Sequence, residues 1–199
     1  MRRLAPLALA LACLGCSSTR QVDTHNDAEI TVSFDWRDFD LAAADMAQSL
    51  LASPRLADAT EEKPLVLAVG RLTNDTCQHL DMDLVAAKLG EALLASGRFD
   101  LSAVFADRES NRDASVSEAR TVRGNAEFDQ RTVQAVGQLK APDLSLSGKI
   151  TQRNVRRDNG GLRVEYLLTL TVTRLATGSS VWQHSANTVK SVADGMPVW

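Results

Sequence analysis

Aromatic residues and excess positive charge are both scarce in this chain. Aromatic residues make up 5% of its 199 positions, and the formal net charge is −3 with a sequence pI near 5.6. Domains that bind nucleic acids usually present a basic surface, and those that bind single strands add aromatic side chains on which bases stack. The composition therefore gives no basis for a nucleic acid partner. The hydrophobic share of 44% and the charged share of 24% are typical of a globular domain.

The sequence also lacks the motifs of common catalytic sites. It contains no G-x-S-x-G, S-x-x-K or H-E-x-x-H sequence and no glycine-rich phosphate loop. Asp81 and Asp83 would point to different faces of a helix, which does not suit paired-carboxylate chemistry. Cys77, His79 and Asp81 form the one close cluster of possible metal ligands or nucleophiles. An enzyme centred on Cys77 and His79 stays an alternative, but we expect no catalytic residue, metal, cofactor or small-molecule substrate.

The apolar run at the start of the chain, Leu4–Leu14, is too short to span a bilayer as an ordinary helix. It follows two arginines, as in a secretory signal peptide. The run ends in Leu-Gly-Cys at Cys16, followed by Ser17, and this resembles a bacterial lipobox. The resemblance implies removal of residues 1–15 and acylation of Cys16, for example with palmitate. The residue after Cys16 is Ser17 and not the aspartate that retains lipoproteins at the inner membrane. The resemblance therefore also implies a location on the periplasmic side of the outer membrane. An ordinary signal peptide with a chance cysteine is the alternative.

The three cysteines fit this location. Removal of Cys13 and acylation of Cys16 would leave Cys77 alone, so no internal disulfide is expected. Residues 16–33 are mostly polar and are expected to form the lipidated N-terminus and a flexible tether. Fully extended, its polar part Ser17–Thr31 would reach roughly 50 Å.

The stretch Leu65–Phe99 predicts a strand, a loop, a helix and the start of a second strand. Leu65–Val69 is a short apolar run, as in a strand covered on both faces. Arg71–His79 is polar and is expected to be the loop. Apolar residues then recur at helical spacing after Asp81, a suitable N-cap, and Gly97 follows as a left-handed stop. The two strands should be parallel and joined by a right-handed crossover.

The elements around this stretch are predicted from the same periodicities. Val32–Trp36 is expected to be a short edge strand or an extended lead-in, and Asp38 or Asp40 to cap a helix with Phe39, Ala43, Met46 and Leu50 on one face. Phe99–Phe105 alternates as a strand with one apolar face. The charged segment from Ala106 to Glu127 is expected to be exposed, with a weak helix over Ser115–Val122. Asp129 is expected to cap a further helix over Gln130–Leu139.

The last third predicts three antiparallel strands, which start near Leu144, Leu162 and Val181. Asn154–Gly161 is expected to be the hairpin connection between the first two. The one tight basic cluster of the mature chain lies here. It consists of Arg156 and Arg157 in this connection and of Arg153 just before it. Arginine is frequent at protein interfaces, so this cluster either docks an acidic partner or keeps the hairpin soluble.

Two regions of the chain share an ordered set of residues with one protein family. The first set consists of Asn74, Thr76, His79, Leu80, Asp81, Ser96, Gly97, Arg98 and Phe99. The second set consists of Gly148, Ile150, Thr177, Gly178, Val181, Trp182 and Lys190. Both resemble the LpoB family, outer-membrane lipoproteins that activate a bifunctional penicillin-binding protein. In that family the histidine and aspartate that correspond to His79 and Asp81 organise the turn into the helix.

The resemblance implies a fold and a function. Residues 34–192 would form a single α/β domain, a mixed sheet with packed helices similar to the TolB N-terminal domain, and residues 193–199 a tail. The protein would be a non-enzymatic lipoprotein of peptidoglycan synthesis that binds and activates a bifunctional penicillin-binding protein, a role in the cell wall and in cell shape. Its candidate partner-binding residues are Asn74, Thr76, His79, Asp81, Arg153, Arg156 and Arg157. The alternative, favoured by the short tether, is a lipoprotein of a secretion or TolB-like assembly at the outer membrane.

Overall fold

The computed structural model describes residues 33–106, 112–158 and 160–192. The chain divides into two units, Met1–Ile30 and Thr31–Trp199, and all described residues belong to the second. The expected signal peptide 1–15, Cys16, the tether up to residue 32 and the tail 193–199 lie outside the described residues. None of the helices in the described ranges is long and apolar enough to cross a membrane.

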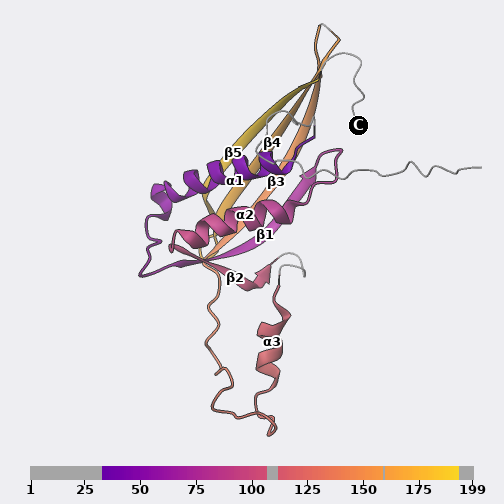
Figure 1. Cartoon of the computed structure of the whole chain (residues 1–199). Coiled ribbons are helices and arrows are strands. Elements are labelled where there is room, and N and C mark those ends of the chain that lie inside the picture. The colour runs from indigo at the N-terminus through magenta and orange to yellow at the C-terminus, as the bar shows by residue number, and fades with distance from the viewer. Residues whose placement is uncertain (1–32, 107–111, 159, 193–199) are drawn as a thin grey trace, which may run out of the picture. The chain divides into compact units, whose positions relative to one another are not determined.

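A five-stranded mixed sheet is the centre of the second unit, with the strand order β2-β1-β3-β4-β5 (Figure 1). The strands are β1 (Leu65–Asp75), β2 (Phe99–Ala106), β3 (Leu144–Arg156), β4 (Leu162–Arg174) and β5 (Ser179–Val192). β1 is parallel to both β2 and β3, whereas β4 is antiparallel to β3 and to β5. The predicted single α/β domain with a mixed sheet is confirmed, and so is the parallel pairing of the first two strands. The right-handed crossover stays a prediction.

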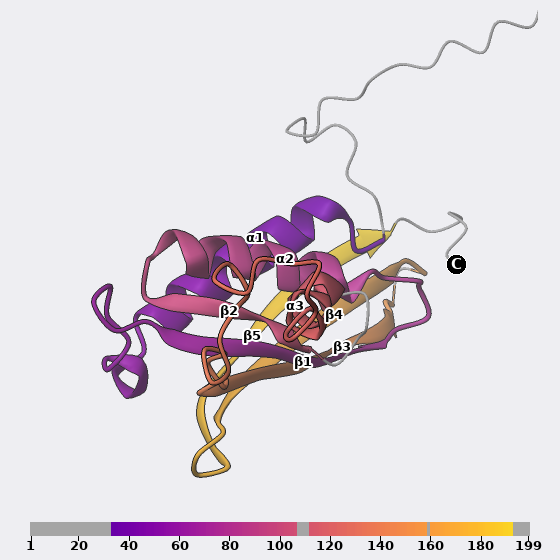
Figure 2. The same cartoon turned by 90° about the horizontal axis from the view of Figure 1, so that it is seen from below.

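Two helices, α1 (Trp36–Leu51) and α2 (Met82–Ala95), lie on the same face of this sheet (Figure 2). α1 packs against α2 and β5, and α2 also packs against β1 and β2. The core forms between these helices and the alternate residues of the strands that face them. Its fully buried side chains include Met46, Leu50, Leu89, Leu93, Leu67, Leu146, Leu168 and Val172. Burying one such side chain contributes roughly 1.5–3 kcal/mol, so this layer supplies most of the stabilisation.

α1 begins earlier than expected. Asp35, rather than Asp38 or Asp40, is its N-cap, and Asp35 Oδ1 accepts hydrogen bonds from the backbone N–H groups of Arg37 at 3.0 Å and Asp38 at 3.3 Å. Asp38 Oδ2 in turn accepts from the Asp35 N–H at 2.8 Å, which completes a capping box. Asp38 therefore supports the cap from the third helical position. The chain is extended at Asp35, and no strand forms in the described part of the lead-in.

β1 continues to Asp75, so the loop expected to begin at Arg71 begins later. The polar end of the strand is held by β3, which pairs with it from Leu72 opposite Gly148 to Asp75 opposite Thr151. Polar residues can extend a strand when a neighbouring strand satisfies their backbone groups. The loop that follows leads directly into α2.

β2 and the segment after it are less buried than expected. β2 pairs with β1 from Phe99 to Leu101 and then only at Ala106. Phe99 is 2% exposed, whereas Phe105 is 49% exposed. The weak helix predicted nearby is confirmed as α3 (Ala114–Thr121), in which every residue is exposed or half-buried.

The helix predicted over Gln130–Leu139 is wrong, because this segment consists of turns, a bend and residues without regular structure. Asp129 Oδ1 accepts from the Arg131 N–H at 3.1 Å, so it caps a turn. The Arg123 guanidinium donates hydrogen bonds to the carbonyl groups of Gln134 at 2.7 Å and of Ala135 at 3.0 Å. In a helix these carbonyl groups would accept from backbone N–H groups of the helix itself. Gly137 has a φ of 84°, the left-handed conformation that ends a helix.

Candidate functional site

The loop between β1 and α2 is shaped by hydrogen bonds among its own residues. We call Asn74–Asp81, which includes the last two residues of β1, the docking loop, after the docking role predicted for it from the sequence. Asn74 Nδ2 donates to the Gln78 carbonyl at 2.7 Å, and Asn74 Oδ1 accepts from Thr76 Oγ1 at 2.7 Å and from the Thr76 N–H at 3.1 Å. Thr76 Oγ1 accepts from the Gln78 N–H at 3.2 Å. The side chains of Asn74 and Thr76 therefore satisfy backbone groups that have no sheet partner, and they fix the loop conformation.

Asp81 and His79 lie where the docking loop meets α2. Asp81 is the N-cap of α2, and its Oδ1 accepts from the Asp83 N–H at 3.0 Å, as the sequence predicts. The His79 side chain is exposed. Both residues line a hollow of about 710 Å³, which is completed by Arg71, Leu72, Thr73, Asn74 and Leu80. The turn into α2 is thus organised by Asp81 at its end and by Asn74 and Thr76 before it.

The three arginines of the basic cluster belong to β3 and to the turn after it. Arg153 and Arg156 lie within β3, and only Arg157–Gly161 connects β3 to β4. The predicted hairpin connection is therefore too long, because its first residues pair with β4. The Arg157 N–H donates to the Gly161 carbonyl at 2.8 Å, and Arg157 Nη1 donates to Ser191 Oγ at 2.7 Å. All three arginine side chains are exposed.

Arg153 lies near the docking loop. Asp75, the last residue of β1, pairs with Thr151, two residues before Arg153 in β3. Cys77 Sγ, in the middle of the loop, donates to Gln152 Oε1 at 3.2 Å. The end of β1, the loop and this part of β3 therefore form one continuous surface.

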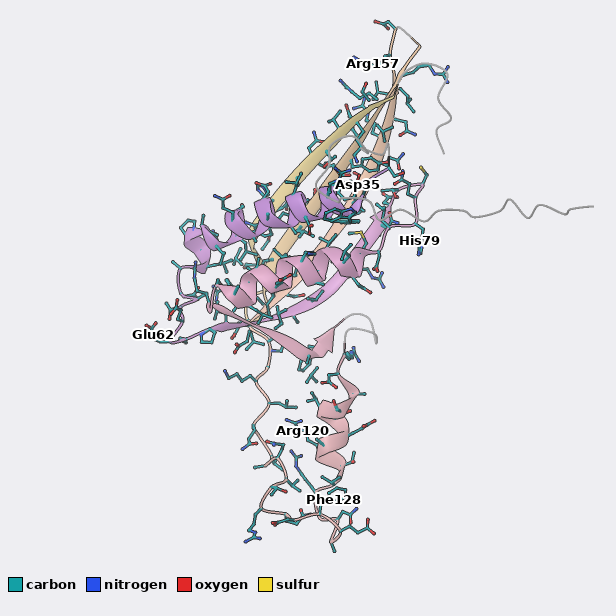
Figure 3. All side chains as sticks on the ribbon, in the orientation of Figure 1. Asp35, Glu62, His79, Arg120, Phe128 and Arg157 are labelled. Atoms are coloured by element: carbon teal, nitrogen blue, oxygen red, sulfur yellow. The ribbon has the colours of Figure 1, made fainter. Side chains whose placement is uncertain are left out.

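Arg156 and Arg157 are further from the loop. Arg156 lies five residues beyond Thr151 in β3, which at about 3.3 Å per residue is roughly 17 Å along the strand. Figure 3 shows Arg157 toward the hairpin end of the sheet and His79 in the loop, apart from each other. Arg153 is thus the one of the three arginines whose backbone lies near the end of β1, whereas Arg156 and Arg157 lie further along the sheet.

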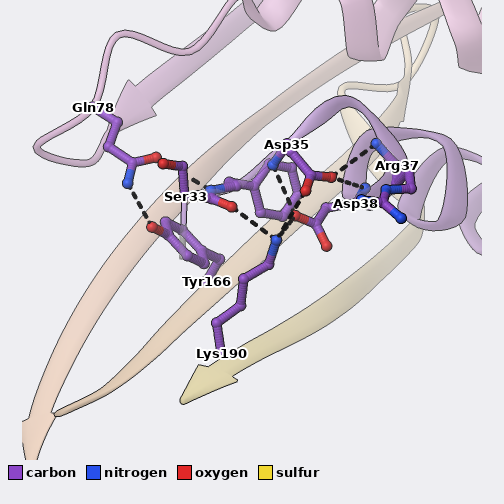
Figure 4. Close-up of polar contacts among 8 residues, drawn as sticks. Ser33, Asp35, Arg37, Asp38, Gln78, Tyr166 and Lys190 are labelled. Carbon is purple, nitrogen blue, oxygen red and sulfur yellow. Dashed lines mark hydrogen bonds and ion pairs between the residues drawn. The ribbon is translucent and has the colours of Figure 1, made fainter. Parts of the chain in front are cut away.

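Gln78 ties the docking loop to the rest of the domain, and sequence reasoning missed it (Figure 4). Gln78 Nε2 donates to Tyr166 Oη at 2.8 Å, and Gln78 Oε1 accepts from the Phe34 N–H at 3.3 Å. The Tyr166 side chain is fully buried, and burial raises the pKa of Tyr166 while its hydrogen bond with Gln78 opposes that rise. The Phe34 ring packs against the rings of Phe39 and Tyr166, with centroids 4.7 and 5.3 Å apart.

Lys190 holds the same region from β5. Its Nζ lies 2.8 Å from the Ser33 carbonyl, 3.4 Å from Asp35 Oδ2 and 2.5 Å from Asp38 Oδ2. Lys190 pairs with Val164, which is buried, so the lysine occupies a core-facing position of its strand. The alternation of β5 could have revealed it, because a lysine in a core-facing row requires a buried partner.

The other candidate chemical groups do not form a cluster. The Cys77 thiol is exposed at the surface of the loop. Among residues 33–106, 112–158 and 160–192, no three His, Cys, Asp or Glu side chains are close enough to hold a metal ion. His184 Nε2 lies 2.8 Å from Asp45 Oδ2 and connects β5 to α1. The docking loop therefore combines an internally hydrogen-bonded conformation with the exposed side chains of Cys77 and His79.

Comparison with known proteins matched one family model and several solved structures. The model of the peptidoglycan-synthase activator LpoB matches residues 38–188. The LpoB C-terminal domain from Salmonella enterica is 16% identical with a TM-score of 0.45, over 76% of this chain and 98% of that one. The same domain from Escherichia coli is 16% identical with a TM-score of 0.44, over 76% and 98%. Lipoprotein GNA1162 from Neisseria meningitidis is 16% identical with a TM-score of 0.34, over 64% and 84%. Comparison with curated proteins gave no match.

Proposed function

The chain belongs to the LpoB family of peptidoglycan-synthase activators, and from that premise we propose that it binds a bifunctional penicillin-binding protein and raises its activity without being an enzyme itself. The family match over residues 38–188 carries this proposal. A partner that performs no chemistry can activate an enzyme only by binding its active conformation more tightly than its inactive one. The proposal therefore requires a rigid surface that distinguishes two conformations of the synthase.

The docking loop and the neighbouring part of β3 are the surface that we assign to this contact. Asn74 and Thr76 hold the loop through internal hydrogen bonds, so it can bind without a large loss of conformational entropy. His79 in the loop and Arg153 in β3 present exposed side chains, and Asp81 fixes the start of α2. Arginine and aromatic side chains dominate the energetics of many interfaces. Arg156 and Arg157, at the hairpin end, would form a second and separate contact.

We place this domain at the outer membrane through a lipid on Cys16. Each buried methylene of an acyl chain contributes roughly 0.8 kcal/mol, so several chains hold a protein at a membrane without a spanning helix. The polar segment Ser17–Thr31, fully extended, would add at most roughly 50 Å between the anchor and the domain, so the synthase would have to approach within about that range from the periplasm. Mass spectrometry of the mature N-terminus tests the anchor, and an unmodified Cys16 would rule it out.

Binding to the purified synthase tests the proposed partner and the proposed surface separately. Wild-type protein should form a complex, and the double variant His79→Ala/Arg153→Ala should bind about tenfold more weakly or worse, since interface residues of this kind often contribute 1–2 kcal/mol or more. Arg131→Ala is the matched control, because its side chain is exposed in the turn segment far along the chain from the loop. The absence of a wild-type complex would contradict the function. Full affinity of the double variant would contradict only the docking surface.

A partner at the outer membrane is the second candidate. The observation that favours it is the short tether, because a domain held close to its anchor meets outer-membrane proteins more readily than an enzyme anchored in the inner membrane. In that case the protein would serve a secretion or TolB-like assembly. Co-purification from membranes distinguishes the two: recovery with an outer-membrane complex and without a synthase supports the second candidate.

A further inference from the structure

The residues at which the chain enters the domain, Ser33–Asp35, are held by separate elements. We call them the lead-in segment. The Ser33 carbonyl accepts from Lys190 Nζ of β5 at 2.8 Å. The next N–H, of Phe34, donates to Gln78 Oε1 of the docking loop at 3.3 Å. The lead-in segment thus connects a sheet strand to the proposed docking surface (Figure 4).

The contact with Lys190 is strong because its charges are shielded from water. The side chains are 8% exposed for Lys190, 16% for Asp35 and 12% for Asp38. The ammonium group lies between the two carboxylates, and these lie at the N-terminus of α1, where the helix dipole favours negative charge. Loss of the ammonium would remove its hydrogen bond to the Ser33 carbonyl and its ion pairs with the two largely buried carboxylates, which would weaken the attachment of the lead-in segment to β5.

Gln78 is fixed from both sides. Its Nε2 is bound to Tyr166 Oη, on a side chain that is fully buried, so its Oε1 is directed at Phe34. Its backbone belongs to the internal network of the docking loop, through the carbonyl that accepts from Asn74 Nδ2 and the N–H that donates to Thr76 Oγ1. A displacement of the lead-in segment removes one of the hydrogen bonds that hold Gln78, and so loosens the loop.

We infer that Gln78 is a positioning residue through which the lead-in segment sets the order of the docking loop. The biological meaning of this coupling rests on the proposed function of the loop and of the tether. When the lead-in segment lies against Lys190, the loop is in its ordered conformation. When the segment is drawn away, the loop loses order and binds its partner less tightly. Because such a coupling is reciprocal, a partner on the loop stabilises the lead-in segment by the same factor.

Hydrogen exchange of the full chain in detergent, without any partner, tests the coupling. Lys190→Met is the decisive variant, since Lys190 Nζ contacts Ser33, Asp35 and Asp38 but its contacts include no residue of the loop. Exchange of the amides of residues 76–80 should become about three- to tenfold faster, the effect of losing one hydrogen bond. Lys149→Met is the matched control. Its Nζ lies 3.2 Å from Asp75 of the docking loop, in an exposed pair that contributes little.

Gln78→Met provides the reciprocal measurement. It should accelerate exchange at Phe34 by a similar factor, whereas Gln152→Met, which removes the contact with Cys77, should leave Phe34 unchanged. Unchanged exchange at residues 76–80 in a folded Lys190→Met protein, or equal effects in the controls, would overturn the coupling. If the amides of β3 and β4 show that Lys190→Met does not fold, the result for Gln78→Met decides. Because no synthase is present, a failure of synthase binding leaves this result unaffected.

Discussion

At the scale of single residues, the stability of this domain depends on polar groups that are buried with their partners. Tyr166 is fully buried, and its hydroxyl is bound by Gln78 at 2.8 Å beneath the docking loop. Arg98 and Lys190 each bind several acceptors at once. Leaving such a group without its partner costs free energy, so substitutions at these residues should lower the free energy of unfolding more than substitutions on the surface.

The ionisation of Tyr166 should make the domain sensitive to alkaline pH. Burial raises the pKa of Tyr166 above the ordinary value of 10.0, so the folded protein resists its ionisation while the unfolded chain does not. Stability from this group is fully present below pH 10 and is lost as pH rises through the higher pKa of the folded state. Denaturation in urea at pH 8 and pH 11 measures this. Tyr166→Phe should reduce the loss between the two pH values, and an equal loss in the variant would contradict the assignment.

Arg98 should resist replacement by lysine. Its Nε donates to the carbonyl of Ala59 at 2.8 Å, and its two terminal nitrogens donate to those of Leu51 at 2.8 Å and Leu56 at 3.0 Å. Lysine has a single charged nitrogen and cannot reach all three carbonyls in this geometry. Arg98→Lys should lower the free energy of unfolding by about 2–3 kcal/mol.

The control for Arg98 is Arg131→Lys, at a side chain that is 90% exposed. Its effect on urea denaturation should stay within about 0.5 kcal/mol. Equal stability of the two lysine variants would show that the three carbonyl contacts contribute nothing beyond charge.

At the scale of the elements, the close approach of β3 and β4 requires a glycine. A Cβ added at Gly148 would lie 2.5 Å from the Thr169 carbonyl oxygen and would also clash with the Leu170 side chain. The carbonyl belongs to the backbone of the paired strand, so it cannot move aside without breaking the ladder. The buried Leu170 side chain occupies the space beside Gly148 that the side chain of any other residue would need.

Gly148→Ala should therefore destabilise the domain by about 3 kcal/mol. Gly124→Ala is the comparison. Gly124 has a φ of 76°, but a Cβ added there would meet no atom within 4 Å, so the substitution should cost only about 1 kcal/mol of backbone strain. Thermal denaturation of both variants measures the difference. A smaller loss at Gly148 than at Gly124 would contradict the packing described for β3 and β4.

The elements also show where local patterns suffice. The helical spacing after Asp81 predicts α2 with its cap, and the alternation after Leu144 predicts the antiparallel strands, because each pattern is complete within the element itself. The end of β1 is not predictable in this way, because β3 supplies its hydrogen bonds from a distant part of the chain. The segment Gln130–Leu139 has apolar residues at helical spacing, but Val136 and Leu139 stay exposed instead of being buried against another element.

At the scale of the whole domain, the sequence predicts the fold better than the site. The order of the helices and strands, apart from the failed helix over Gln130–Leu139, and the role of Asp81 follow from periodicity and capping, and the mixed sheet is what the resemblance to the LpoB family implies. The contacts that hold the docking loop do not, because Gln78 and Tyr166 are 88 residues apart and Lys190 is 155 residues from Asp35. No local pattern encodes such pairs, and only the folded sheet brings them together.

The rate of glycan polymerisation by the purified bifunctional synthase, measured with and without this protein, tests the account most directly. We expect the rate to rise severalfold as the protein is added, to reach a plateau when the synthase is saturated, and to fall back toward the basal rate with the His79→Ala/Arg153→Ala variant. A synthase that binds the wild-type protein but polymerises at its basal rate would contradict the account, because binding would then not distinguish the active conformation from the inactive one.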